Sequence, residues 1–175
     1  TEIAGGVRNV YMYDCVFEGT DQAFRFKTRR PRGGFVENIY VERVRANVKR
    51  QALYCDMLGS ARWVGELAQR YPAREITPLT PWFANISIHD VEITGCSTLV
   101  DVSALPEKPV KNFFFGNVKA HCDRIGKICD ATKFSMKDVR IESCDTVMRI
   151  DNCDYASFFG FSNVTTGSSV KIEKT

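Results

Sequence analysis

Hydrophobic positions along this chain follow a pattern that recurs from one segment to the next. Four six-residue stretches carry an asparagine at their third position, between apolar residues: Val7–Met12, Val36–Val41, Phe83–Ile88 and Val110–Phe115. A fifth copy begins at Lys133, which stands where the asparagine would be. Self-similarity of this kind indicates a repeat architecture before any single element is assigned.

The copies share the same apolar columns when each asparagine, or Lys133, is numbered zero. Positions +1, +3, +6, +8 and +17 are apolar in all five copies. Side chains on one face of a strand recur every two residues, so a change from odd to even positions and back requires two corners. Each copy is therefore predicted to hold three short strands. The residues predicted for the +17 column are Phe26, Cys55, Val102, Cys129 and Ile150.

Five copies and a shortened sixth near Phe158 predict an all-β parallel solenoid of about six coils. A helical array is the alternative, but the alternation and the β-branched and aromatic residues favour strands. One connection between copies is long: residues 58–82, which include Trp63 and Trp82. Insertions on one side of a solenoid commonly build its binding face, although these tryptophans could equally form the loop's own small core.

Composition narrows the functional classes. Of the 175 residues, 44% are hydrophobic and 26% charged, as in ordinary globular domains, and no apolar run approaches the about 20 residues of a membrane span. The net charge of +3 is too small to indicate nucleic-acid binding by itself. Seven cysteines without a Cys-x-x-Cys pair give no support for a metal site or a cofactor, and His89 and His121 are expected at surface corners. Among Cys96, Cys122 and Cys144, on consecutive coils, two could approach disulfide distance.

Candidate chemistry gathers in the third strand of the first copy. Phe24 and Phe26 point inward by the parity argument, so Arg25 and Lys27 point outward together. Fixed cations on a rigid strand suit a polyanionic ligand, because arginine can bind a carboxylate through two hydrogen bonds. The competing interpretation is a cross-strand ion pair between Lys27 and Asp56. The following turn holds further arginines, which are expected to be solvated turn charges: Arg29, Arg30 and Arg32.

These residues carry a resemblance to a known family. The segment from Phe17 to Ile39, with Gly-Thr-Asp before Arg25-Phe-Lys27 and Gly-Gly-Phe-Val-Glu-Asn-Ile after it, resembles a signature of glycoside hydrolase family 28, the pectin-degrading polygalacturonases. The bacterial exo-acting type is the most similar. Members are right-handed, single-stranded parallel β-helices of the pectin-lyase-like kind. The resemblance covers about residues 2–41 and implies that residues 1–175 are the C-terminal part of one β-helix domain, with the N-terminal coils missing.

The resemblance implies an inverting hydrolase that cleaves α-1,4-galacturonide linkages in pectin. Arg25 and Lys27 would bind the uronate carboxylate beside the cleavage point, and Tyr54, predicted beside Arg25, is a further candidate sugar contact. The family's catalytic Asn-Thr-Asp and Asp-Asp motifs and its Gly-His-Gly do not occur in this sequence. Inverting hydrolysis needs two carboxyl groups about 6.5–9.5 Å apart, so we expect no catalytic residue in this chain and no activity from it alone. Asp21 is expected to be a turn residue rather than a substitute catalyst.

Other functions compete with this interpretation. A non-catalytic β-helix module that binds acidic polysaccharide would use the same residues. Nucleic-acid binding is disfavoured because the phenylalanines beside Arg25 and Lys27 face inward and leave no stacking platform. A purely structural shaft would leave the basic turn unexplained. We expect an acidic polysaccharide or oligosaccharide as partner, no nucleic acid, no membrane, no metal and no cofactor, a monomeric chain, and a secreted or periplasmic parent, since pectin is extracellular.

Overall fold

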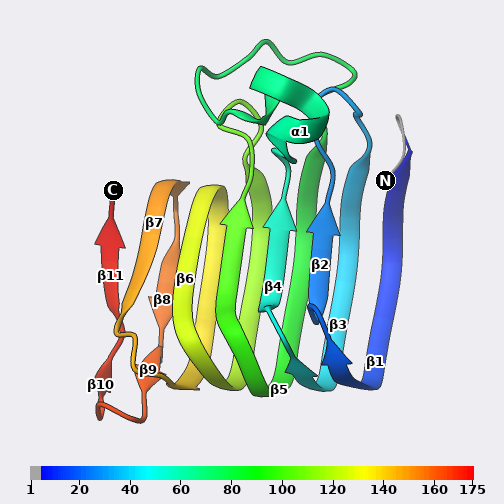
Figure 1. Cartoon of the computed structure of the whole chain (residues 1–175). Helices are drawn as coiled ribbons and strands as arrows, with labels where there is room; N and C mark the ends of the chain where they lie inside the picture. The colour runs from blue at the N-terminus through cyan, green and yellow to red at the C-terminus, as the bar shows by residue number, and fades with distance from the viewer. Residues whose placement is uncertain (1–4) are drawn as a thin grey trace.

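The computed structural model describes residues 5–175 and is built mostly of β-strands that pair in parallel. The main path of hydrogen-bonded neighbours runs β1-β3-β5-β6-β7-β11. Figure 1 shows these strands side by side from the N-terminal to the C-terminal end, with a loop carrying the helical turns over one edge. The longer strands are β1 (Gly6–Thr20), β3 (Phe35–Val48), β5 (Trp82–Ser103), β6 (Val110–Glu142) and β7 (Val147–Asp154).

Shorter elements complete the chain. The strands among them are β2 (Phe24–Lys27), β4 (Gln51–Asp56), β8 (Ser157–Phe159), β9 (Ser162–Asn163), β10 (Ser168–Ser169) and β11 (Lys171–Lys174). The long loop contains the helical turns α1 (Ala61–Val64) and η1 (Gly65–Ala68). Apart from the β9–β10 pair and a single bridge at Leu105 and Lys108, the strand pairs of residues 5–175 are parallel. The prediction of an all-β protein with parallel strands is therefore confirmed, and the arrangement is compatible with a parallel solenoid.

The register of the strands follows the apolar columns of the sequence. Val10 lies opposite Ile39, Ile39 opposite Ile86, and Ile86 opposite Phe113. The rings of Phe113 and Phe134 stack with centroids 4.8 Å apart, which extends this column into the fifth copy. The stacked columns form one continuous hydrophobic core. Its interior is wholly apolar along this column because successive copies present the same positions inward.

Asparagine occupies the corner at position zero, where one copy joins the next, because it tolerates the backbone conformation required there. Asn9, Asn38, Asn85 and Asn112 all have left-handed backbone angles, with φ between 52° and 57°. The side-chain amides of Asn38, Asn85 and Asn112 each donate a hydrogen bond to the side-chain oxygen of the asparagine one coil earlier, over 3.0, 3.1 and 2.9 Å. The predicted corner between positions +3 and +6 is also left-handed in every copy, at Asp14, Arg43, Asp90, Asn117 and Asp138.

One column was predicted wrongly. Val102 lies opposite Ile128 rather than Cys129, and Ile128 is fully buried while Cys129 is partly exposed. The cause is a one-residue shortening of the corner between Ala120 and Cys122 in β6, after which the register is shifted. The column that begins at Asp56 therefore continues through Ser103 and Cys129 to Asp151, and Asp130 lies one residue beyond it.

The same shift sets Cys96 directly opposite Cys122, and both thiols are buried. All seven cysteines of the chain are nevertheless free, so none of the candidate pairs forms a disulfide. Neither helical turn within residues 5–175 has the length or the apolar character that a membrane-spanning helix requires.

Candidate functional site

The strongest candidate site is a cationic hollow where β2 ends and the 58–82 loop begins. It has a volume of about 520 Å³, and its lining residues come from β2, β4, the start of the loop and the helical turn α1. Basic and aromatic side chains dominate its walls: Arg25, Lys27, Arg29, Arg32, Tyr54 and Trp63. The remaining lining residues are Thr28, Asp56, Gly59 and Ser60.

On β2, the side chains of Arg25 and Lys27 point outward, as the parity argument predicted. Phe24 is buried and Phe26 half-buried, while Arg25 and Lys27 between and after them are exposed. Phe26 contacts the rings of Phe83 and Phe113 edge-on, which holds the strand against the core. The outward direction of Arg25 and Lys27 is therefore fixed by the packing of the residues beside them.

Tyr54 lies next to Arg25 on the neighbouring strand. The two residues are paired in register, and the guanidinium carbon of Arg25 lies 5.9 Å from the centre of the Tyr54 ring. This cation–π contact orients the guanidinium over a flat, apolar surface. Burial, followed by the nearby Asp56 carboxylate, raises the pKa of Tyr54 to about 12, so the phenol is neutral at physiological pH.

Asp56 is engaged by the start of the loop rather than by Lys27. One carboxylate oxygen accepts hydrogen bonds from the backbone N–H groups of Leu58 and Gly59, both at 3.0 Å, and the other accepts from the Tyr54 hydroxyl at 3.3 Å. Lys27 lies opposite Asp56 in register, but within residues 5–175 its ammonium makes no ion pair. The competing interpretation of a Lys27–Asp56 pair is therefore wrong, because the turn takes the carboxylate.

Arg25 and Arg29, like Lys27, form no ion pair with a carboxylate in the part of the chain that the structure describes. The three charges converge on the hollow, whose described lining contains a single carboxylate, that of Asp56. The hollow therefore has an excess of positive charge that an anionic ligand would neutralise.

Arg30 is not the solvated turn charge that was expected. Only 5% of its side chain is exposed, and it makes a two-fold ion pair with Glu107, with both N–O distances at 2.6 Å. It also donates to the backbone oxygens of Leu67 at 3.1 Å and Gln69 at 2.7 Å. The loop folds over this arginine and shields it from water. Burial acts to raise the pKa of the Glu107 carboxyl, but the hydrogen bonds and the charge of Arg30, together with backbone hydrogen bonds, outweigh burial and lower that pKa.

Arg70, in the middle of the loop, fastens it to the coils beyond. It pairs with both oxygens of the fully buried Asp130, at 2.6 and 2.9 Å, and with Asp151 on β7. Hydrogen bonding to Asp130, ahead of that to Asp151, raises the pKa of the guanidinium. The loop is thus held at two points, and this fixes the wall that it contributes to the hollow.

The two tryptophans of the loop have different roles. Trp63 lines the hollow and its side chain is largely exposed, whereas Trp82 stacks on Phe35 with ring centroids 5.4 Å apart. Trp63 is therefore available to a ligand, and Trp82 secures the return of the loop into β5. Gly59 lets the start of the loop pass close to the Arg29 side chain. Its φ of +76° is left-handed, and a Cβ at this position would lie 3.0 Å from the Arg29 Cβ.

The structure brings together Arg25, Lys27 and Tyr54, the substrate-binding residues predicted from the sequence. Sequence reasoning undervalued Arg29 and Arg32, and it did not single out Asp101, which lies opposite Tyr54 on β5. Burial raises the pKa of the Asp101 carboxyl, while Lys127 acts to lower it. Asp21 does not line the hollow, and its backbone oxygen accepts from the N–H of Arg50, as suits a turn residue.

Comparison of the chain with protein-family models, with curated proteins and with solved structures gives no match. The hollow must therefore be interpreted from its own geometry and charge.

Proposed function

We propose that the hollow binds a uronate unit of an acidic polysaccharide, with Arg25 and Lys27 on its carboxylate. Support comes from one observation above all: three cations that form no ion pair within residues 5–175 surround a space also lined by Tyr54 and Trp63. Guanidinium groups bind carboxylates through paired hydrogen bonds, and flat aromatic side chains present an apolar face to a sugar ring.

The wider proposal is that this chain is part of a pectin-degrading glycoside hydrolase of the polygalacturonase type, built as a right-handed, single-stranded parallel β-helix and secreted or periplasmic. Such an enzyme would cleave α-1,4-galacturonide linkages with inversion. The resemblance of residues 17–39 and the parallel pairing of the strands support this proposal.

In this proposal the hollow holds the substrate and does not perform the acid and base steps. Inversion requires a carboxylic acid to protonate the leaving oxygen and a carboxylate to activate water. Asp56, the one carboxylate in the described lining, is already taken by the loop turn and by Tyr54. The contribution assigned to these residues is therefore to fix the sugar carboxylate next to the reacting bond.

A binding experiment tests the first part. Oligogalacturonate should titrate into the chain with saturable heat, while the fully methyl-esterified oligomer, which lacks the charge, should not. Arg25→Ala and Lys27→Ala should each weaken binding at least about tenfold, since a charge-assisted hydrogen bond contributes roughly 1.5–3 kcal/mol. Lys137→Ala, at an exposed lysine that does not line the hollow, is the matched control. Equal affinity in all variants would refute the assignment.

A non-catalytic module that binds acidic polysaccharide is the second candidate function, and it is favoured by the commitment of Asp56 to the loop turn. Release of reducing ends from polygalacturonate separates the two candidates. The chain alone should release none. The full-length parent should release them if it is a hydrolase and should bind without cleavage if it is a binding module.

A further inference from the structure

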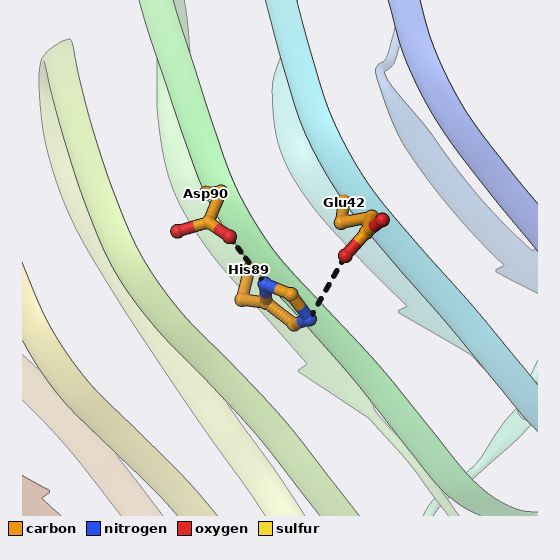
Figure 2. Close-up of side chains that lie close together, drawn as sticks. All are labelled: Glu42, His89 and Asp90. Atoms are coloured by element: carbon orange, nitrogen blue, oxygen red, sulfur yellow. Dashed lines mark hydrogen bonds and ion pairs between the residues drawn. The ribbon is translucent and has the colours of Figure 1, made fainter.

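We propose that Glu42 and His89 bind a divalent transition-metal ion, with Asp90 as the residue that orients the imidazole. The candidate ligand atoms of these three residues all lie within 4.8 Å of one another, and Figure 2 shows His89 between the two carboxylates. None of the three lines the cationic hollow, so this site is separate from the proposed sugar-binding site.

The coil register creates the cluster. Glu42 on β3 lies directly opposite His89 on β5, although they are far apart in the sequence. Neighbouring residues of a regular strand point to opposite faces, but Asp90 has a φ of 55° at the corner between positions +3 and +6. The corner breaks the alternation and brings the Asp90 carboxylate beside the imidazole of the residue before it.

The hydrogen bond to Asp90 leaves the other imidazole nitrogen facing Glu42. Nδ1 of His89 lies 2.7 Å from Oδ2 of Asp90, so a proton on Nδ1 is donated to that carboxylate. In the neutral imidazole with this tautomer, Nε2 carries a lone pair, and Oε2 of Glu42 lies 3.9 Å from it. Two electron-rich atoms that face each other are stabilised by a cation between them. A carboxylate behind a histidine is also the arrangement that orients metal-binding imidazoles.

In each carboxylate, one oxygen faces away from the imidazole and accepts hydrogen bonds from other residues. The oxygen nearer the imidazole stays available, in Glu42 to the metal ion and in Asp90 to the Nδ1 proton of His89. Oε1 of Glu42 accepts hydrogen bonds from the Tyr11 hydroxyl and the Arg43 guanidinium, and Oδ1 of Asp90 accepts from the Asn117 amide. These bonds, from Tyr11 first for Glu42 and from Asn117 first for Asp90, lower the pKa of each carboxyl, so both are anionic at neutral pH.

Within residues 5–175, Arg43 is the one cation that pairs with this cluster, and it is shared. Arg43 contacts Glu42 and also pairs with Asp14, with Nε–Oδ1 at 2.7 Å and a second contact at 3.2 Å. One guanidinium therefore serves two carboxylates and makes no ion pair with the third, that of Asp90. The excess negative charge favours a divalent ion over a protein cation at this corner.

The combination of one nitrogen ligand from His89 and one oxygen ligand from Glu42 indicates which class of metal ion would bind. Imidazole nitrogen with carboxylate oxygen suits zinc and other first-row transition ions, whereas magnesium and calcium take oxygen ligands. Two ligands of a tetrahedral zinc ion lie about 3.4 Å apart, so Nε2 and Oε2 must approach by about 0.5 Å, which a glutamate side chain can accommodate. Water would complete the coordination.

Titration of the metal-free chain with zinc chloride in a calorimeter tests the proposal. The wild-type chain should bind zinc saturably, and magnesium in excess should not displace it. His89→Gln and Glu42→Gln should abolish saturable binding. Asp90→Asn should weaken it roughly 10- to 100-fold, as losses of orienting partners do. Far-UV circular dichroism confirms that each variant keeps its strands.

His121→Gln is the matched control, because His121 also lies near a carboxylate, with Nδ1 3.5 Å from Oε2 of Glu142, but has no second carboxylate on its other nitrogen within residues 5–175. It should bind zinc as the wild type does. Unchanged affinity in His89→Gln would overturn the proposal, and so would an equal loss in His121→Gln. A cobalt(II) spectrum with sulfur-to-metal charge-transfer bands would assign the ion to a cysteine and would also overturn it.

Discussion

Replacement of Arg30 by methionine probes how the loop is held, because it removes the charge and the donors while keeping much of the side-chain length. Arg30 and Glu107 each have 5% of their side chain exposed. Removal of one partner from a buried ion pair costs about 3–5 kcal/mol, because the other charge stays buried without compensation. The loop can respond by leaving its seat, and Glu107 is then hydrated. The cost should therefore appear as opening of the 58–82 loop rather than as global unfolding.

Hydrogen–deuterium exchange of the loop amides measures this opening. A loss of about 3 kcal/mol raises the opening equilibrium by more than about 100-fold, with the coils of the core unaffected. Arg45→Met is the control, since Arg45 is exposed and lies 3.9 Å from Glu18, and such surface pairs contribute at most about 1 kcal/mol. The double variant Arg30→Met with Glu107→Leu should recover most of the protection, because it removes both buried charges. Equal loop exchange in Arg30→Met and Arg45→Met would refute the reasoning.

Three further outcomes are expected. The Glu107 pKa is lowered in the folded chain, so its contribution is present above the pKa of a free glutamate, about 4.3, and is lost as the pH falls through the folded value. The opening equilibrium of the loop, obtained from amide exchange after correction for the intrinsic exchange rate at each pH, should therefore rise on acidification below about pH 4. Gly59→Ala should weaken oligogalacturonate binding in calorimetry, because the new Cβ sits 3.0 Å from Arg29 in a left-handed backbone, and unchanged binding would contradict this. Asn85→Gly keeps the left-handed corner but loses two hydrogen bonds of the asparagine ladder, so it should lower the free energy of unfolding in urea by about 1–2 kcal/mol. Asn85→Val should lower it further, because valine is also strained in a left-handed backbone. Equal losses in the two variants would contradict the conformational argument.

Much of the β architecture could be predicted because it depends on a periodic signal. The inward columns and the outward direction of Arg25 and Lys27 follow from parity alone, and the structure confirms both. The error at Cys129 has a simple cause: Ile128 beside it is apolar too, so a corner shortened by one residue leaves no mark in the hydrophobic pattern.

Neither the fold of the loop nor the histidine cluster was predicted, and the reasons differ. The fold of residues 58–82 depends on particular ion pairs rather than on a repeated pattern. The hydrophobic periodicity therefore does not predict that the loop covers Arg30. Glu42 and His89 share position +4 of their copies, so the alignment did contain that juxtaposition. It was missed because metal-ligand spacing was sought along the chain rather than across the coils.

The anchoring of the loop by Arg70 changes how this stack of coils should come apart. In a solenoid each coil contacts only its neighbours, so stability is close to a sum of local terms and the ends can fray one coil at a time. Here a loop that leaves after β4 is fastened to Asp130 on β6 and to Asp151 on β7. That connection ties non-adjacent coils together, so the C-terminal coils cannot detach without releasing the wall of the hollow. Loss of order at one end of the stack is thereby transmitted to the cationic hollow near the other.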